Sequence, residues 1–271
     1  MRWRFIAPLS LLLAACDRPA SPQLGAVASA APSASVHAPV ALVPELVSSS
    51  VTDVSGLRVV SGTVRYGSLW GFSDLAVDLA VTRLRIVSAQ RGAPLAKLLP
   101  EGALAVVNGG YFEADFRPSS WLKHEGVELA KKTDTSKGGV LALGSAGSYV
   151  GDFAGLSFDP ALAIQSHPLI VEAEGKPGIH RDDGRRAART VACKKVDALH
   201  FIVISAPRGE GPTLFETSAL LREPAPRGFG CTRALNLDGG PSSGVVFGAD
   251  VPARSREPTA PVAYGIAMMP R

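Results

Sequence analysis

The chain has 271 residues, of which 46% are hydrophobic and 19% are charged, and its formal net charge is +4. Two of the positive charges, Arg2 and Arg4, lie at the extreme N-terminus, and the remaining charge is too small to indicate a nucleic-acid-binding protein. We therefore expect no nucleic-acid partner. Beyond the N-terminal segment, no apolar run reaches the length of a transmembrane helix.

The N-terminal segment is typical of an exported bacterial lipoprotein. Its apolar stretch, Phe5 to Ala15, has the length of a signal-peptide core and is too short for a permanent membrane span. It ends in Leu13-Ala14-Ala15-Cys16, which resembles the lipobox in which the cysteine receives a diacylglyceryl group. We expect a signal peptide over 1–15 and a lipid anchor at Cys16, which would hold the chain on a bacterial membrane with its domain in the periplasm or outside the cell. An ordinary secretory signal with a chance cysteine is the alternative.

The next segment, residues 16–50, is dominated by Ala, Ser and Pro and has very few charges. Such a composition buries too little apolar surface to offset the entropy of ordering, so we expect a disordered tether. One globular domain is expected over 51–271. It contains Cys193 and Cys231, which in an oxidising compartment form either a disulfide or two separate buried thiols.

Within this domain, short apolar runs alternate with glycine-rich turns, which indicates many strands. The expected strands are 82–87, 103–107, 140–143, 148–150, 199–204, 234–237, 245–247 and 262–269, with a hairpin turn at 144–147. Helices are expected over 95–99 and from Thr213, which with Glu216 has the capping-box order, to about Arg222. These elements predict an α+β fold: a single domain with a mixed, mainly antiparallel β-sheet and a few flanking helices.

Two polar motifs follow apolar strands. The first is Asn108-Gly109-Gly110-Tyr111-Phe112, and the second is Asp238-Gly239-Gly240-Pro241-Ser242-Ser243. In each, a buried strand delivers a polar side chain to the edge of a sheet, and the glycines allow backbone amides to approach a ligand. Taken singly, either motif is also compatible with an ordinary hairpin turn.

Two further segments lie between these motifs, namely Gln165-Ser166-His167-Pro168-Leu169-Ile170-Val171 and Arg189-Thr190. The four segments in this order resemble the phosphodiester glycosidase family, over roughly residues 100–270. Two positions depart from the family pattern, because Cys193 and Pro241 stand where a glycine is usual. Both changes bear on loop conformation and on the range of substrates.

The resemblance implies hydrolysis of a sugar–phosphate diester at the anomeric carbon, through a transition state with oxocarbenium character. Arg189 is then the phosphate clamp, and Asp238 activates water or stabilises positive charge at the anomeric carbon. Asn108 is expected to orient a sugar hydroxyl or a phosphate oxygen. The expected substrate-binding residues are Gly109, Gly110, Thr190, Gly239, Gly240, Ser242 and Ser243.

Other polar residues carry two interpretations each. His167 is either a general acid or a structural histidine beside Pro168. Ser242 and Ser243 either bind phosphate or cap a turn. Glu113 or Asp115 could supply a second carboxylate, and Arg185 and Arg186 could form no more than a solvated basic loop. Of the aromatic pair Tyr111 and Phe112, one member could stack on a sugar while the other belongs to the core. No cofactor and no metal site are expected, because no Cys/His cluster has ligand spacing.

Two non-enzymatic hypotheses compete with the hydrolase. A non-catalytic envelope lipoprotein could bind a phosphorylated glycan in the same cleft, and a purely structural lipoprotein would need none of the polar residues. The presence of Asn108, Arg189 and Asp238 together favours catalysis, because binding alone does not require the whole set.

Overall fold

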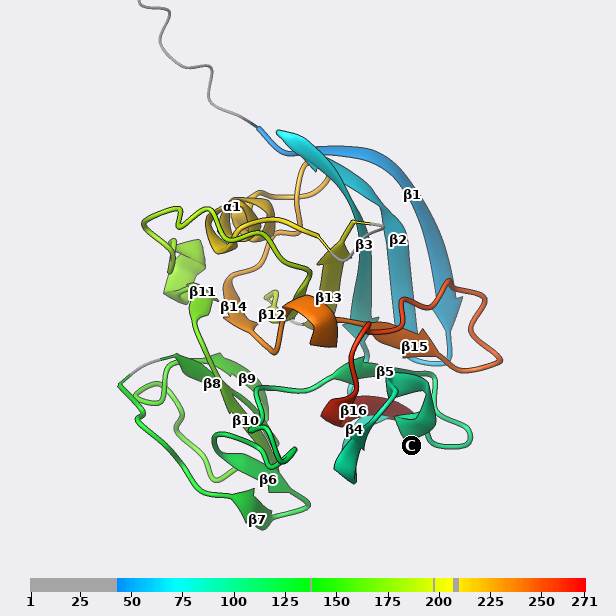
Figure 1. Ribbon diagram of the computed structural model, residues 1–271, viewed down its shortest axis with the longest axis vertical. Coiled ribbons are helices and arrows are strands. Elements are labelled where there is room, and N and C mark those ends of the chain that lie inside the picture. The colour runs from blue at the N-terminus through cyan, green and yellow to red at the C-terminus, as the bar shows by residue number, and fades with distance from the viewer. Residues whose placement is uncertain (1–42, 137, 197, 207–209) are drawn as a thin grey trace, which may run out of the picture. The chain divides into compact units, whose positions relative to one another are not determined.

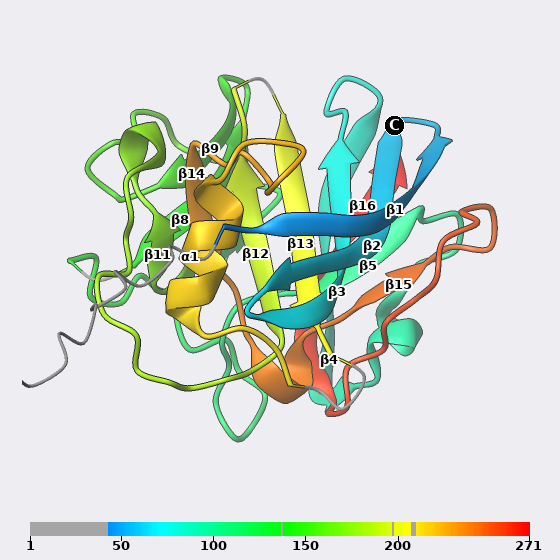
Figure 2. The ribbon, with the colours of Figure 1, turned by 90° about the horizontal axis from the view of Figure 1, so that it is seen from above.

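The computed structural model describes residues 43–136, 138–196, 198–206 and 210–271. The compact unit formed by Ala41–Arg271 consists mainly of strands in three antiparallel sheets (Figures 1 and 2). The expected signal peptide, Cys16 and the tether up to residue 42 lie outside the described residues. The boundary expected at residue 50 was wrong, because strand β1 (Glu45–Val54) already begins five residues earlier.

The largest sheet has seven strands and contains β12 (Arg189–Lys194), which begins with Arg189, and β14 (Arg233–Asn236), which precedes Asp238. Figure 2 shows its strands side by side, with α1 (Leu214–Arg222) lying across one face. In spatial order the strands are β1, β2 (Leu57–Tyr66), β3 (Ser68–Val77), β13 (Leu199–Ser205), β12, β14 and β11 (Leu169–Val171).

Two smaller sheets pack beneath it. A four-stranded sheet contains, in order, β15 (Val245–Phe247), β5 (Ala105–Asn108), β16 (Val262–Pro270) and β4 (Thr82–Ala93). A five-stranded sheet contains β7 (Val127–Ala130), β6 (Leu122–His124), β10 (Leu162–Ser166), β8 (Gly139–Gly144) and β9 (Gly147–Gly151). Three 3-10 segments complete the described elements: η1 (Leu95–Leu98), η2 (Ala173–Gly175) and η3 (Gly240–Ser242).

The central strand β13 shows how the sequence divides between two cores. Because successive strand residues point to opposite faces, Leu199, Phe201 and Val203 enter the main core between the sheets. Ile202 and Ile204 face the other way, into a second core under α1. Each such buried side chain contributes about 1.5–3 kcal/mol of transfer free energy. This strand was expected to be buried and central, and both expectations are confirmed.

The α+β prediction was wrong in its helix content. The described residues contain one α-helix, α1, so the fold is mainly β. Its capping box is confirmed, since Thr213 Oγ1 accepts from the amide of Glu216 at 3.2 Å and the Glu216 carboxylate accepts from the amide of Thr213 at 2.8 Å. The helix expected over 95–99 is the single 3-10 turn η1, because Pro100 follows at once and leaves no room for an α-helical turn.

Cys193 and Cys231 form a disulfide with a Cα–Cα distance of 5.7 Å. Both side chains belong to the buried cluster under α1. The bond fixes the segment that follows α1 to β12, the strand that begins with Arg189. Among the residues that the structure describes, no helix has the length and hydrophobicity needed to cross a membrane.

Candidate active site

The side chain of Asn108 joins the two glycine motifs. Its Nδ2 donates to the main-chain carbonyl of Asp238 at 2.8 Å and to that of Gly109 at 3.2 Å. Its Oδ1 accepts from Thr190 Oγ1 at 2.6 Å and from the amide of Gly244 at 3.0 Å. Asn108 is 0% exposed, and both donor hydrogens and its acceptor are occupied by protein groups. The structure therefore makes it a positioning residue, which corrects the expectation that it touches a sugar hydroxyl or a phosphate oxygen.

Thr190 is likewise bonded inside the protein and not toward a ligand. It is fully buried, and its hydroxyl donates to Asn108 instead of facing a ligand. Its main-chain carbonyl accepts from the amide of Leu237 at 2.9 Å. β12 and the strand before Asp238 are thus held in register through Thr190, which corrects its expected role as a phosphate donor.

The glycines of the first motif serve close packing. A Cβ at Gly109 would overlap the ring of Tyr264, and one at Gly110 would contact the Tyr264 hydroxyl. The amide of Gly109 donates to the carbonyl of Tyr264 at 3.0 Å, and the amide of Gly110 donates to the Tyr264 hydroxyl at 2.8 Å. Both amides are occupied, so neither is a free phosphate donor as the sequence suggested.

The second motif forms a turn around the Asp238 carboxylate. Asp238 Oδ1 accepts from the amide of Gly239 at 2.9 Å, and the Ser242 side chain acts to lower the pKa of the carboxylate. Gly240 has φ of 61°, a left-handed conformation that favours glycine, and its amide donates to the carbonyl of Ala188 at 2.8 Å. Burial raises the pKa of Asp238 above its usual value, and the bonds from Ser242 and Gly239 only partly oppose this effect.

The amides of Gly239 and Gly240 are thus also used inside the protein, which corrects their expected role as free phosphate donors. The Ser242 side chain lowers the pKa of Asp238 and so acts on this carboxylate. The neighbouring Ser243 is buried, and its Oγ has no hydrogen-bond partner among the described residues. Of the donors expected in this motif, the Ser243 hydroxyl is therefore the one with no partner among the described residues, and it lies below the surface.

Arg189 is a buried cation held by main-chain carbonyls. Its Nε donates to the carbonyl of Pro212 at 3.1 Å, and Nη2 donates to that of Arg185 at 2.8 Å. Its side chain forms no ion pair with any carboxylate in the described part of the chain. Desolvation lowers the pKa of Arg189, with Tyr111 and Asp183 acting in the opposite direction. A guanidinium remains charged when it is buried. Among the described residues this charge has no ion-pair partner, and the Asp183 carboxylate acts on it without an ion pair.

Tyr111 lies near both charged groups. Burial and the Asp238 charge raise the pKa of the Tyr111 hydroxyl to about 12, while the Arg189 charge opposes the shift. The hydroxyl accepts from Asn236 Nδ2 at 2.7 Å, which leaves its own hydrogen free to be donated. The exposed His167 ring stacks on the Tyr111 ring, with centroids 4.6 Å apart and planes at 28°.

The structure thus brings Arg189, Asp238, Tyr111 and His167 to one place. Asn236, which sequence reasoning had left without a role, belongs there because it holds the Tyr111 hydroxyl and the carbonyl of His167. Its position two residues before Asp238, as a polar residue in an apolar strand, was the available signal. His167 as a general acid stays a prediction.

Several residues with open interpretations lie elsewhere. Asp115 is exposed and pairs with Arg117 at 2.6 Å, while Phe112 stacks on Phe116 beside the main core. Arg186 pairs with Glu216, the capping residue of α1. The other two, Glu113 and Arg185, have exposed side chains.

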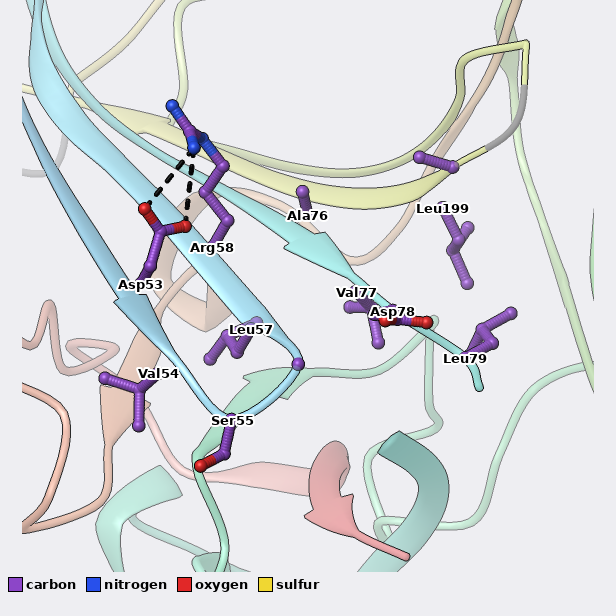
Figure 3. A pocket seen from close by; sticks show the side chains of 12 residues that line it. Asp53, Val54, Ser55, Leu57, Arg58, Ala76, Val77, Asp78, Leu79 and Leu199 are labelled. Carbon is purple, nitrogen blue, oxygen red and sulfur yellow. Dashed lines mark hydrogen bonds and ion pairs between the residues drawn. The ribbon is translucent and has the colours of Figure 1, made fainter. Parts of the chain in front are cut away.

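A pocket of about 520 Å³ lies at the turn between β1 and β2 (Figure 3). Arg58 and Asp53 form an exposed ion pair of 3.3 Å at its rim, and Leu57, Val77 and Leu199 line it. None of the motif residues lines this pocket, and an exposed ion pair beside aliphatic side chains supplies no clear catalytic group. The candidate site is therefore the cluster around Asp238.

Residues 101–269 match the sequence profile of the family described as phosphodiester glycosidase, and this range is more than half of the chain. The chain belongs to the phosphodiester glycosidase family. The family match contains both glycine motifs and Arg189, the residues that the geometry brings together. No curated protein matches the chain.

Several solved structures have a fold similar to that of this chain. The zebrafish N-acetylglucosamine-1-phosphodiester alpha-N-acetylglucosaminidase catalytic domain, auto-inhibited by its pro-peptide, has a TM-score of 0.59 and 15% identity, covering 87% of this chain and 85% of its own. A hypothetical protein from Synechocystis has a TM-score of 0.61 and 14% identity over 80% of this chain, which spans 62% of that structure. An exported protein from Burkholderia pseudomallei has a TM-score of 0.55 and 13% identity, with 76% and 77% covered. At these identities the likeness shows the fold alone.

The two departures from the phosphodiester glycosidase pattern have structural counterparts. Cys193 forms the disulfide with Cys231, so its side chain has a partner that a glycine would lack. Pro241 is exposed in the first turn of η3, where the missing amide hydrogen costs no helical hydrogen bond. Neither substitution displaces Asp238 or Arg189 from the cluster.

Proposed function

We propose that this protein is a hydrolase that cleaves the bond between the anomeric carbon of a sugar and a phosphodiester oxygen. One observation carries the proposal. A buried guanidinium, Arg189, which pairs with no carboxylate among the described residues, and a half-buried carboxylate, Asp238, both lie near the Tyr111 hydroxyl. The family match supports the reaction class. The substrate is accordingly a phosphorylated sugar in which the phosphate bridges to a second group.

Arg189 is suited to bind the phosphate because hydrogen bonds within the fold already hold its guanidinium in a buried position. The carbonyls of Pro212 and Arg185 fix its plane, and Nη1 faces the turn at Gly239, where a Cβ would lie 3.8 Å from it. A planar, fixed guanidinium matches two phosphate oxygens and neutralises the charge that grows as the phosphate departs.

Asp238 is suited to act as the general base that activates the attacking water. In its ionised form the carboxylate accepts a proton from a water molecule whose oxygen attacks the anomeric carbon. The carbon–oxygen bond to phosphate breaks, its electron pair stays on the phosphate, and the proton passes from Asp238 to solvent. A phosphate monoester is a good leaving group, so this step needs no strong general acid.

Tyr111 and His167 form the sugar-binding side of the proposed site. The Tyr111 hydroxyl, raised in pKa and held by Asn236, stays protonated and donates to a sugar hydroxyl or to the bridging oxygen. The exposed His167 ring stacks on the Tyr111 ring and presents a flat face on which a sugar ring could pack. This assignment leaves His167 a contact residue unless a pH profile shows proton transfer.

One observation favours the alternative, a phosphoglycan-binding protein without activity. All four motif glycine amides are bonded inside the protein, so phosphate stabilisation depends on side chains alone. A site with so few donors could hold a phosphodiester without cleaving it. The two functions differ in turnover, which a direct assay measures.

The test is incubation of the purified chain with UDP-N-acetylglucosamine and with the methyl phosphodiester of N-acetylglucosamine 1-phosphate, with free sugar followed by mass spectrometry. We expect sugar release that is lost in both Arg189→Gln and Asp238→Asn. Saturable binding of either diester without sugar release, abolished by Arg189→Gln, would support the binding protein instead. Arg58→Gln, at the unrelated pocket, is the matched control for charge removal.

We further propose that the chain works in the bacterial cell envelope, anchored through lipid at Cys16. The support is the order of residues before this cysteine, with a basic start, an apolar core and small residues. Radiolabelled fatty acid should be incorporated into the wild-type chain and not into Cys16→Ser. A labelled Cys16→Ser chain, or a wild-type chain left in the cytoplasm, would contradict the anchor.

A further inference from the structure

A groove of about 840 Å³, lined by both polar side chains and the apolar Leu69 and Trp70, adjoins the Asp238 turn. Strands β1 and β2 line one side with serine and threonine hydroxyls, and the loop between β15 and β16 lines the other. In Figure 1 this loop, in orange, runs beside the ends of β1 and β2. Apart from Gly240 and Ser243 of the second glycine motif, the groove is therefore built from segments that lie outside the motifs.

Arg256 supplies the fixed positive charge of the groove. Its main chain pairs with Val245 in both directions, at 2.7 and 2.8 Å, and its Nη1 donates to Ser205 Oγ at 3.1 Å. The guanidinium lies so close to Gly71 that a Cβ there would overlap it. Burial lowers the pKa of Arg256, and the nearby charge of Arg254 lowers it further.

No carboxylate in the described part of the chain neutralises this charge. Arg256 forms no ion pair there. The single acidic residue among those that line the groove, Glu257, uses its Oε1 to accept from the amide of Ala96 at 3.1 Å. With Arg254 and Arg256 against Glu257, the groove walls carry a net positive charge that suits an anion.

The groove meets the site on its phosphate side. Ala188, which precedes the proposed clamp Arg189, lines it together with Gly240 and Ser243. The Oγ of Ser243 is buried and has no partner in the described residues. Tyr111 and His167, on the sugar side, do not line the groove. A substrate with its scissile phosphate at Arg189 therefore places its leaving group toward Ser243 and Arg256.

We propose that this groove binds the leaving group, and that Arg256 binds a second phosphate carried on it. This inference rests on the proposed glycosidase function, because it assigns the part of the substrate beyond the scissile phosphate. The Ser48 and Thr63 hydroxyls on β1 and β2 bond each other at 2.9 Å, and each keeps further hydrogen-bonding capacity for a polyhydroxyl chain. The substrate class we propose is a phosphate-repeating glycan or polyol polymer.

The test compares two diesters of N-acetylglucosamine 1-phosphate on the full chain. One carries methyl on the phosphate, and the other carries glycerol 3-phosphate, which adds the second phosphate. The wild-type chain should show a lower KM for the second diester. Arg256→Gln should raise that KM by about tenfold or more, the scale of one charge-assisted hydrogen bond, and leave the methyl diester unchanged.

Two further variants keep the test independent of folding. Arg254→Glu, at an exposed position of the same groove, places a carboxylate against the second phosphate without removing Arg256, and should raise the same KM. Arg91→Gln removes an exposed charge from β4, outside the groove, and should change neither KM. Equal KM values for the two diesters in the wild-type chain would overturn the proposal, as would a loss with both diesters in Arg256→Gln.

Calorimetric titration with glycerol 3-phosphate separates this proposal from the glycosidase function. Binding to the wild-type chain and to Arg189→Gln, lost in Arg256→Gln, supports the groove even if neither diester is hydrolysed. Hydrolysis of both diesters at equal KM, with no binding of glycerol 3-phosphate, overturns the groove and leaves the glycosidase function intact.

Discussion

The side-chain amide of Asn108 and the main-chain carbonyl of Asp238 are joined by a hydrogen bond of 2.8 Å. The bond links the end of β5 to the loop after β14, and therefore links the four-stranded sheet to the seven-stranded sheet. A second bond in the same place runs from the amide of Asp238 to the carbonyl of Gly109, at 3.1 Å. The position of the carboxylate thus depends on Asn108, whose side-chain nitrogen and oxygen are both fully bonded inside the protein.

Replacing Asn108 by Ala should reduce stability and activity together. The change leaves the Thr190 hydroxyl and the Gly244 amide buried without an acceptor, at about 1–3 kcal/mol for each unsatisfied group. Urea unfolding should therefore show a loss of a few kcal/mol, with reduced kcat/KM in the folded fraction. Thr190→Val, which removes one of these bonds, should cost less. Full stability of Asn108→Ala with lost activity would instead mean that Asn108 acts on substrate directly.

Replacing Asp238 by Asn should separate activity from stability. Because burial raises the pKa of Asp238, the folded chain holds this proton more tightly than the unfolded chain. The folded state therefore gains stability as pH falls through the raised pKa and lacks that gain at neutral pH. Asp238→Asn should keep or raise the unfolding free energy at pH 7 and lower the rate by about 100-fold or more.

The wild-type pH profile supplies the matching check on Asp238. The rate requires the ionised carboxylate, so it should fall with acid at a pH above the ordinary aspartate pKa of about 4. An Asp238→Asn chain that retains the wild-type rate, or a wild-type rate that rises with acid, would exclude Asp238 as the base.

Replacing Arg189 by either Gln or Lys should abolish most of the activity. A lysine ammonium cannot reach the carbonyls of Pro212 and Arg185 and also present a planar fork to phosphate. We expect a fall in kcat/KM of about 100-fold, comparable to the loss of a preorganised donor. Arg185→Gln is the control, because its exposed side chain is removed while its carbonyl remains. Near-normal activity in Arg189→Lys would show that charge alone is sufficient.

The sequence predicted the residues of the site better than their roles. Asp238, Arg189 and His167 meet in space, as the order of the four motifs indicated. Asp238 and His167 follow the strands β14 and β10, and Arg189 begins β12. The hydrogen-bond partners of Asn108, Thr190 and the motif glycines could not be predicted from the sequence. The same residues would stand at these positions whether they bind a ligand or bind one another. Only the partner at 2.6–3.2 Å decides between these cases.

The fold was predicted unevenly for a physical reason. Strands with buried apolar runs, such as 199–204 and 245–247, were found. The hairpins of β1, β2 and β3 were missed because their exposed faces carry Ser and Thr, and Ser48 to Ser50 resemble a tether. Their pairing to β13 is a long-range contact, and no local pattern in 45–77 specifies it.

Removing the disulfide should weaken the fold on the side of α1. Cys193 and Cys231 are 38 residues apart, and closing a loop of this length contributes about 2–4 kcal/mol in the unfolded-chain entropy account. The Cys193→Ala, Cys231→Ala double variant should lose that amount in urea unfolding, and the reductant-treated wild-type chain should lose a similar amount. Unchanged stability in both would mean that the two thiols are not bonded in the folded chain.

Replacing Asp74 by Asn should remove a buried ion-pair network on the face of the sheet under α1. The Asp74 carboxylate is 7% exposed and lies 2.7 Å from His200 Nδ1. It also accepts a hydrogen bond from Lys195 Nζ at 3.1 Å. Burial alone would raise the pKa of Asp74, but His200 and Lys195 outweigh it and the net shift is downward. Breaking such a buried group of charges costs about 3–5 kcal/mol.

The pH dependence of Asp74 follows from the direction of its shift. A lowered folded pKa gives stability that is present above the unfolded pKa of about 4 and is lost as pH falls through the folded value. The stability difference between wild type and Asp74→Asn, measured by urea unfolding from pH 7 downward, should therefore shrink below about pH 4. Asp53→Asn, which removes an exposed pair with Arg58, should cost at most about 1 kcal/mol. A difference that stays constant or grows with acid would show that the Asp74 carboxylate is not stabilised in its ionised form.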